Sequence, residues 1–141
     1  MRNEVWHSPF RGMIPKDKYE MQLIQGEEKG FLEMGVSPLQ TPDVPTYVTL
    51  DFGIAQAVNI LDEGVQLAPP PGVCFQNQKE LHQSGFPDTL YHVENGAYAA
   101  YIQACMSHEL YEAMDLRQFN LVTLNYVVEI ICFDEPTITA T

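Results

Sequence analysis

Alternating apolar and polar positions, which are typical of half-buried β-strands, recur along much of the chain. The segments that predict strands are residues 19–24 and 31–36, joined as a hairpin by the glycine-bounded loop 26–30, and residues 46–52, 89–94 and 121–133. The last of these becomes apolar on both faces from Tyr126 onward. That pattern is typical of a strand in the middle of a sheet.

Helical spacing is clearest near residue 100. Apolar residues at positions 99, 102, 106, 110 and 113 predict one long amphipathic helix over about 97–115, with Asn95 as its N-cap. Residues 54–61 also follow a helical spacing and end before Gly64, although a strand through 58–61 stays open. A thin apolar stripe in residues 75–83 predicts a short surface helix.

Together these segments predict the α+β class: one domain over residues 18–141 with an antiparallel or mixed sheet of about five strands and one long helix. Residues 1–17 show neither the helical nor the strand spacing of apolar residues and are expected to form an extended N-terminal arm. Two proline-rich segments interrupt the domain. Residues 37–45 are expected to be a rigid connector, and residues 68–72 a stiff loop, with a polyproline ligand as the alternative.

The composition indicates a folded protein and disfavours several partners. In 141 residues, 45% are apolar and 18% are charged, which excludes intrinsic disorder. The formal net charge of −12 argues against nucleic acid as the main partner. Mimicry of nucleic acid needs closely spaced carboxylates, but the acidic residues occur mainly as isolated pairs, as ordinary solubility requires.

The cellular setting is expected to be the cytoplasm, or a virion assembled in the host cytoplasm. The first residues lack the apolar segment of a secretory signal, and no apolar run approaches the ~20 residues of a membrane helix. Three scattered cysteines are too few for a secreted disulfide framework. They are expected to be buried, reduced thiols.

No catalytic motif stands out, and we expect a protein that is not an enzyme, with no cofactor and no metal. The one suggestive group is Cys105, His108 and Glu112, which share a face of the predicted long helix and are all possible zinc ligands. A zincin needs a second histidine four positions after the first, and here that position is Glu112. A solvated polar helix face is the simpler interpretation.

The expected arm differs from the rest of the chain in charge. Residues 1–18 hold four of the seven basic residues and carry a net charge of +2, whereas residues 19–141 carry −14. Trp6 and Phe10 could anchor the arm on a partner, because large aromatic side chains dominate interface energies. The predicted partner-binding residues are Trp6, Phe10, Arg2, Arg11 and Lys16.

A small acidic body, an extended arm, reduced cysteines and no catalytic signature resemble the virion accessory proteins of tailed bacteriophages. These include capsid cement and decoration proteins and head-to-tail or tail-completion subunits. The resemblance implies a structural subunit of a large homo-oligomeric or symmetric hetero-assembly, with protein partners and neither nucleic acid nor membrane. Two alternatives stay open: a small acidic antagonist or ligand-binding module, and a metal-dependent enzyme that uses the Cys105, His108 and Glu112 face.

Overall fold

The protein is built mainly of β-strands, arranged in two sheets. The computed structural model describes residues 2–14, 19–25, 32–38, 47–62, 73–75, 81, 86–106 and 115–140. The strands are β1 Arg2–His7, β2 Tyr19–Gln25, β3 Leu32–Pro38, β4 Val48–Gly53, β5 Ala55–Asp62, β6 Val73–Phe75, β7 Leu90–Glu94, β8 Arg117–Val122, β9 Tyr126–Cys132 and β10 Thr137–Ala140. The helix α2 spans Ala97–Cys105.

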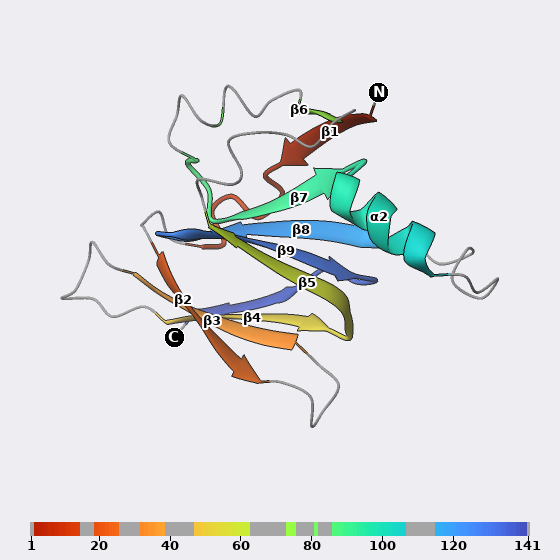
Figure 1. The fold of residues 1–141 in the computed structure, drawn as a ribbon. Coiled ribbons are helices and arrows are strands. Elements are labelled where there is room, and N and C mark those ends of the chain that lie inside the picture. The colour runs from red at the N-terminus through yellow and green to blue at the C-terminus, as the bar shows by residue number, and fades with distance from the viewer. Residues whose placement is uncertain are drawn as a thin grey trace.

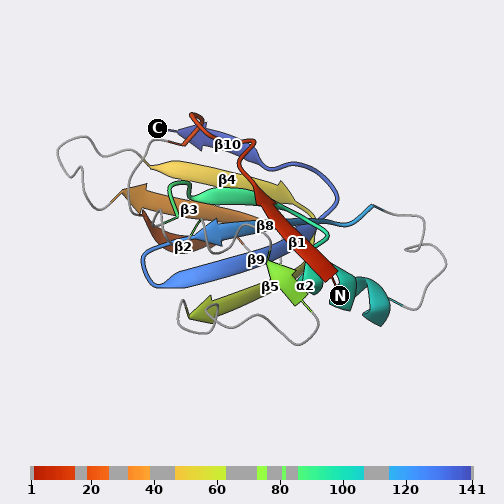
Figure 2. The same ribbon diagram turned by 90° about the horizontal axis from the view of Figure 1, so that it is seen from above.

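The larger sheet has the strand order β5-β9-β8-β7-β1-β6, and the smaller one β10-β4-β3-β2 (Figure 1). Every pairing is antiparallel except that of β1 with β6, which is parallel. β1 pairs with β7, which lies far along the chain, so the N-terminal residues belong to the larger sheet. In Figure 2 β1 runs diagonally across the middle of the view, with the N-terminus at its lower end.

The main core lies between the two sheets, where alternate residues of β4, β8 and β9 face each other. It comprises Phe10, Tyr19, Val48, Leu50, Phe52, Leu90, Phe119, Leu121, Val128, Ile130 and Cys132. The rings of Phe52 and Phe119 lie 6.3 Å apart between centroids and link the two sheets. Burial of this apolar surface is the principal force that holds the sandwich together.

A glycine lets the chain pass from the smaller sheet to the larger one. β4 and β5 are separated only by Ile54, yet they pair in different sheets. Gly53, the last residue of β4, has φ +65°, a conformation that residues with a Cβ disfavour. Its N–H donates to Oδ1 of Asp51 at 2.9 Å, which stabilises the bend.

The outer face of the larger sheet carries a second cluster of buried residues and the helix. Trp6, Leu81, Tyr91, Val93 and Val127 form that cluster. No residue of α2 is buried, and α2 has no side-chain cap at its own N-cap residue. Apolar packing therefore contributes little to holding α2 in place. Polar contacts from the sheet, described below, are its main attachment.

The predicted α+β class and the helix over 97–115 are wrong. α2 ends at Cys105, and Met106 has the extended angles φ −85° and ψ 97°. The helical spacing of apolar residues did not indicate a core helix, because none of the nine residues of α2 is buried. The rest of the predicted helix, residues 107–114, lies outside the described residues.

Asn95 is not the N-cap of this helix. That position belongs to Gly96, whereas Asn95 adopts φ 56° and its side-chain N–H donates to the carbonyl oxygen of Asn3. Asn95 therefore ties the β7–α2 turn to β1 and does not cap α2.

Two further predictions change in detail. Residues 55–62 form strand β5 and not a helix, because seven of them pair in register with β9. The strand predicted over 121–133 is two strands, β8 and β9, joined by a turn at 123–125 in which the N–H of Thr123 donates to Tyr126 O at 2.9 Å. Leu124 and Asn125 are exposed at this turn.

Other local predictions are confirmed. β2 and β3 form the predicted hairpin, and β4 and β7 match the strands predicted over 46–52 and 89–94. Near the C-terminus, residues 137–140 add β10 to the edge of the smaller sheet. Most of the predicted connector at 37–45, the proline-rich loop 68–72 and most of the surface helix 75–83 lie outside the described residues.

Candidate functional site

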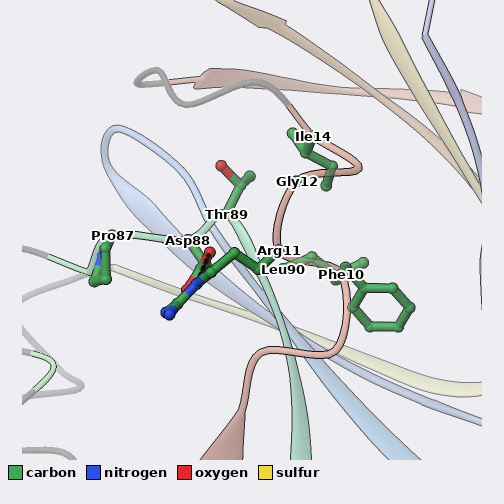
Figure 3. Close-up of a pocket in the computed structure, with 8 residues that line it drawn as sticks. All are labelled: Phe10, Arg11, Gly12, Ile14, Pro87, Asp88, Thr89 and Leu90. Atoms are coloured by element: carbon green, nitrogen blue, oxygen red, sulfur yellow. Dashed lines mark hydrogen bonds and ion pairs between the residues drawn. The ribbon is translucent and has the colours of Figure 1, made fainter.

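A pocket of about 440 Å³ opens where the segment after β1 meets the segment that enters β7. It is lined by Phe10, Arg11, Gly12, Ile14, Pro87, Asp88, Thr89 and Leu90 (Figure 3). Pockets of this size can hold a small organic molecule. The two segments are distant in sequence, so the pocket exists only once β1 has paired with β7.

The first wall of the pocket is a tight pair of turns. The N–H of Arg11 donates to Ser8 O at 3.4 Å, and the N–H of Met13 donates to Phe10 O at 3.0 Å. Gly12 lies between them with φ +89°, which other residues adopt only with strain. This turn holds the side chain of Arg11 at the mouth of the pocket while Phe10 points into the core.

Asp88 on the opposite wall fixes the position of Arg11. Its Oδ2 accepts hydrogen bonds from Arg11 Nη2 at 2.7 Å and from Ser8 Oγ at 2.8 Å, and its Oδ1 accepts from Arg11 Nε at 3.3 Å. The Asp88 side chain is 12% exposed, whereas that of Arg11 is 66% exposed. Asp88 also raises the pKa of Arg11, so the guanidinium group is charged at any physiological pH.

The backbone at Asp88 is held by a buried phenol. The N–H of Asp88 donates to the hydroxyl oxygen of Tyr91 at 3.0 Å. Burial raises the pKa of Tyr91 to about 12, so this phenol stays neutral. The wall that carries Asp88 is therefore anchored in the second core cluster.

The pocket thus combines one exposed cation with an apolar floor. Phe10 and Leu90 belong to the main core, and Ile14 packs against that core. Figure 3 shows Arg11 against Asp88 on one side of the pocket and Phe10 and Ile14 on the other. Such a surface can bind an amphipathic organic anion.

A second polar cluster lies on the outer face of the larger sheet and holds α2. Oε2 of Glu4 accepts from the N–H of Ala97 at 2.8 Å, and Oε1 of Gln118 accepts from the N–H of Ala99 at 3.0 Å. These two side chains, from β1 and β8, satisfy two of the free N–H groups at the start of the helix. Gly96 packs directly against the Gln118 side chain, which leaves no room there for a Cβ.

The cluster continues across the sheet to β9 and β5. Gln118 Nε2 donates to Asn120 Oδ1 at 3.0 Å and to Glu129 Oε2 at 3.2 Å, while Asn59 Nδ2 donates to Glu129 Oε1 at 3.0 Å. Burial, with a smaller effect of the charge on Glu4, raises the pKa of Glu129. Both Glu129 oxygens already accept hydrogen bonds, so this cluster is a structural support for α2.

The free edge of β5 presents apolar side chains to solvent. β5 ends the larger sheet, and within the described residues no strand pairs with its other side (Figure 2). Val58 is 38% exposed and Ile60 is 53% exposed. Their partners in register, Ile130 and Val128 on β9, are fully buried. The smaller sheet therefore covers β9 but leaves this face of β5 uncovered.

The structure disperses the residues predicted to bind a partner. Trp6 is only 3% exposed, its indole N–H donates to Glu4 Oε1 at 2.9 Å, and its ring packs on Tyr91. Phe10, 6% exposed, lies in the main core and reaches the pocket. Both aromatic side chains therefore stabilise the chain's own core, and a role in docking a partner is not proposed for them.

The basic residues of the same set have separate places. Arg11 lies at the mouth of the pocket, and Arg2 begins β1 opposite Val73 of β6. Lys16 lies outside the described residues. Residues 2–7 are extended, as expected of an arm, but they form strand β1 within the sheet.

The predicted metal face is only partly described. Cys105 is exposed, whereas His108 and Glu112 lie outside the described residues. Of the cysteines, Cys132 is buried as expected, and Cys105 is not. No group of three possible metal ligands occurs in the described parts of the chain.

Comparison with known proteins adds no relative. No family model, no curated protein and no solved structure matches the chain. Among the helices that the structure describes, none is long and apolar enough to cross a membrane.

Sequence reasoning missed Asp88 and Glu4, the acidic residues that organise the pocket and the helix attachment. Asp88 follows Pro87 in the irregular segment before β7, an ordinary setting for a solvated aspartate. Glu4 gave a weak signal, since it lies two positions before Trp6 in a segment that proved to be a strand. Recognising that alternation would have placed Glu4 on the same face as a buried tryptophan.

Replacing His92 by glutamine should flatten the dependence of stability on pH. Burial, followed by electrostatic repulsion from the neighbouring His7 and Arg117 side chains, lowers the pKa of His92 below its ordinary value of 6.5, while Glu135 and Glu94 oppose the shift. The folded state therefore binds this proton less tightly than the unfolded state does. Because of its lowered pKa, His92 adds to the free energy of unfolding above pH 6.5. This stabilisation is lost as the pH falls through the folded-state pKa.

The measurement is the melting midpoint of both proteins at a series of pH values below 6.5. The difference between the two curves isolates His92 from Glu129, whose raised pKa acts in the opposite direction. Parallel curves for wild type and variant would contradict this assignment.

Proposed function

We propose that the protein is a non-enzymatic assembly subunit, which pairs with a second copy of itself through strand β5. The observation that supports this most is the long edge of β5, which is apolar, carries a charge only at its last residue, and has no partner strand among the described residues. Unpaired edge strands of this kind are templates for pairing with another chain. The activity of such a protein is the formation of an interface.

The four strands at the edges of the two sheets differ in how well they are protected from pairing with another chain. β6 and β10 are short, with three and four residues. β2 has seven residues but carries Glu20 and a bulge between Leu23 and Gln25. β5 has eight residues and a single charge, Asp62 at its end, and its one register irregularity lies at its start, between Ala55 and Ala57. Short strands, charges and bulges are the usual protections of an edge, so β5 is the edge best suited to pairing.

The choice of a second copy follows from charge. A protein with a net charge of −12 repels its own copies, so their contact needs a surface free of carboxylates. Residues 54–61 contain no charged side chain. In addition, Ile54, Val58 and Ile60 are exposed on and beside this strand, so apolar area is available for burial.

The strand is also self-complementary. In an antiparallel pair of β5 strands centred on Asn59, Val58 lies opposite Ile60 of the second copy, and Ala57 opposite Leu61. Asp62 then lies opposite Gln56, so no two carboxylates face each other. A symmetric contact of this kind is isologous and closes as a dimer.

Sedimentation velocity over a range of protein concentrations tests this proposal. Wild type should show a concentration-dependent dimer, and Ile60→Lys should remain monomeric because two lysines would enter the apolar contact. The fold should survive this change, because the Ile60 side chain is already 53% exposed. Thermal melting of the diluted monomers checks that survival.

Tyr101→Lys is the matched control. Tyr101 is 64% exposed, lies on α2 and is not part of β5, and the substitution makes the same change in charge. It should leave dimerisation unchanged. Wild type that stays monomeric at high concentration, or an Ile60→Lys variant that dimerises like wild type, would overturn the proposal.

A further inference from the structure

From the pocket between residues 10–14 and 87–90, we infer a second property that does not depend on β5. We propose that this pocket binds an organic monocarboxylate with an apolar body, such as a medium-chain fatty acid. Arg11 would contact the carboxylate, and Phe10, Ile14 and Leu90 would receive the hydrocarbon part. The pocket volume of about 440 Å³ exceeds the volume of such a molecule.

The sign of the ligand charge follows from the exposure of the two charged groups. Both oxygens of Asp88 accept hydrogen bonds from within the protein, and its side chain is only 12% exposed. A cationic ligand therefore finds no free acceptor on Asp88. Arg11 is 66% exposed, and its guanidinium group has five N–H donors, of which Asp88 engages those on Nε and Nη2.

Asp88 makes this cation a better receptor than a mobile surface arginine. Its two contacts hold the guanidinium plane in one orientation before any ligand arrives, which lowers the entropy lost on binding. The anchor extends inward, because Ser8 and the buried Tyr91 hold Asp88 itself. Arg11 is thus a fixed positive group in a protein with a net charge of −12.

The charge of the pocket lining favours a carboxylate with one negative charge over a phosphate, which carries more. Among the described residues that line the pocket, Arg11 is the only cation, and the Asp88 carboxylate offsets part of its charge. Such a lining favours a ligand with a single negative charge. The rest of the lining combines the apolar side chains of Phe10, Ile14, Pro87 and Leu90 with Gly12, the Thr89 hydroxyl, and the Asp88 carboxylate, which Arg11 and Ser8 already engage. A ligand therefore needs an apolar body as well as its charge.

The experiment is a titration of the full chain with octanoate, followed by calorimetry and by the amide NMR signals of residues 11–14 and 88–90. Octanoate should bind saturably, and affinity should rise from acetate through butyrate to octanoate. Octan-1-ol and inorganic phosphate should bind much more weakly. Arg11→Gln should weaken octanoate binding about tenfold or more, because it removes a charge-assisted contact.

Arg117→Gln is the matched control, since Arg117 is a half-buried arginine whose nearest carboxylate, Glu135, lies 3.9 Å away. It should bind octanoate like wild type, and so should Ile60→Lys, which separates this inference from the dimer. Folding of Arg11→Gln is checked by its melting midpoint. No saturable binding, equal binding of octan-1-ol, or unchanged affinity in Arg11→Gln would overturn the proposal.

Discussion

Replacing Phe119 by alanine should lower the free energy of unfolding by about 3–5 kcal/mol, the largest effect expected of any single substitution here. Phe119 is 1% exposed, and its ring lies 5.9 Å from Phe10, 6.3 Å from Phe52 and 5.3 Å from His92 between centroids. It therefore connects the segment after β1, the smaller sheet and β7. Truncation leaves a cavity whose three sides belong to different elements, which cannot all collapse into it.

Chemical denaturation with urea measures this loss, and Tyr101→Ala is its control. Tyr101 is an aromatic residue that is 64% exposed, so its truncation should change stability by no more than about 0.5 kcal/mol. Domains of this size are typically stable by only about 5–15 kcal/mol, so the Phe119 variant should be close to unfolding. A loss below about 1 kcal/mol for Phe119→Ala would show that the two sheets do not pack as described.

Replacing Glu4 by alanine should cost about 2–3 kcal/mol and should loosen α2. Glu4 is 2% exposed and accepts hydrogen bonds from the indole N–H of Trp6 and the backbone N–H of Ala97. The substitution removes both contacts inside the protein, where water cannot replace them. Since α2 buries none of its own side chains, loss of this attachment should affect the helix more than the sheets.

Two measurements separate a local effect from a global one. Urea denaturation gives the loss of stability, and hydrogen exchange at the amides of 97–100 should accelerate by more than the global loss explains. Glu94→Ala is the control, because Glu94 is exposed and its contact with His7 lies at the surface. It should cause a much smaller loss. Normal exchange in α2 of the Glu4 variant would contradict the proposed attachment.

The elements that sequence reasoning identified are those whose partners lie nearby in the chain. The hairpin of β2 and β3 is one, because alternation and a glycine-bounded loop suffice to bring two adjacent strands together. The strand β7 was visible from its own composition, since it is short and its apolar residues Leu90, Tyr91 and Val93 are all buried. In these segments the hydrophobic pattern and the local backbone preference agree.

Sequence reasoning failed where the local pattern of apolar residues was compatible with more than one structure. Residues 54–61 have apolar residues at helical spacing and also include β-branched ones, and only pairing with β9 makes them a strand. The spacing at 99–113 predicted a core helix, yet the sheet beneath α2 is held to it through Glu4 and Gln118. Apolar spacing alone does not show whether a surface exists to cover that face.

By itself, the sequence determined that the chain folds, that it carries a strong negative charge, and that several of its segments are strands. Only the tertiary structure decided that β1 joins the larger sheet, because its pairing with β7 brings together residues that are distant in the chain. That pairing buries Trp6, places Arg11 beside Asp88 and so forms the pocket. The free edge of β5 likewise depends on the full strand order, which local patterns do not contain.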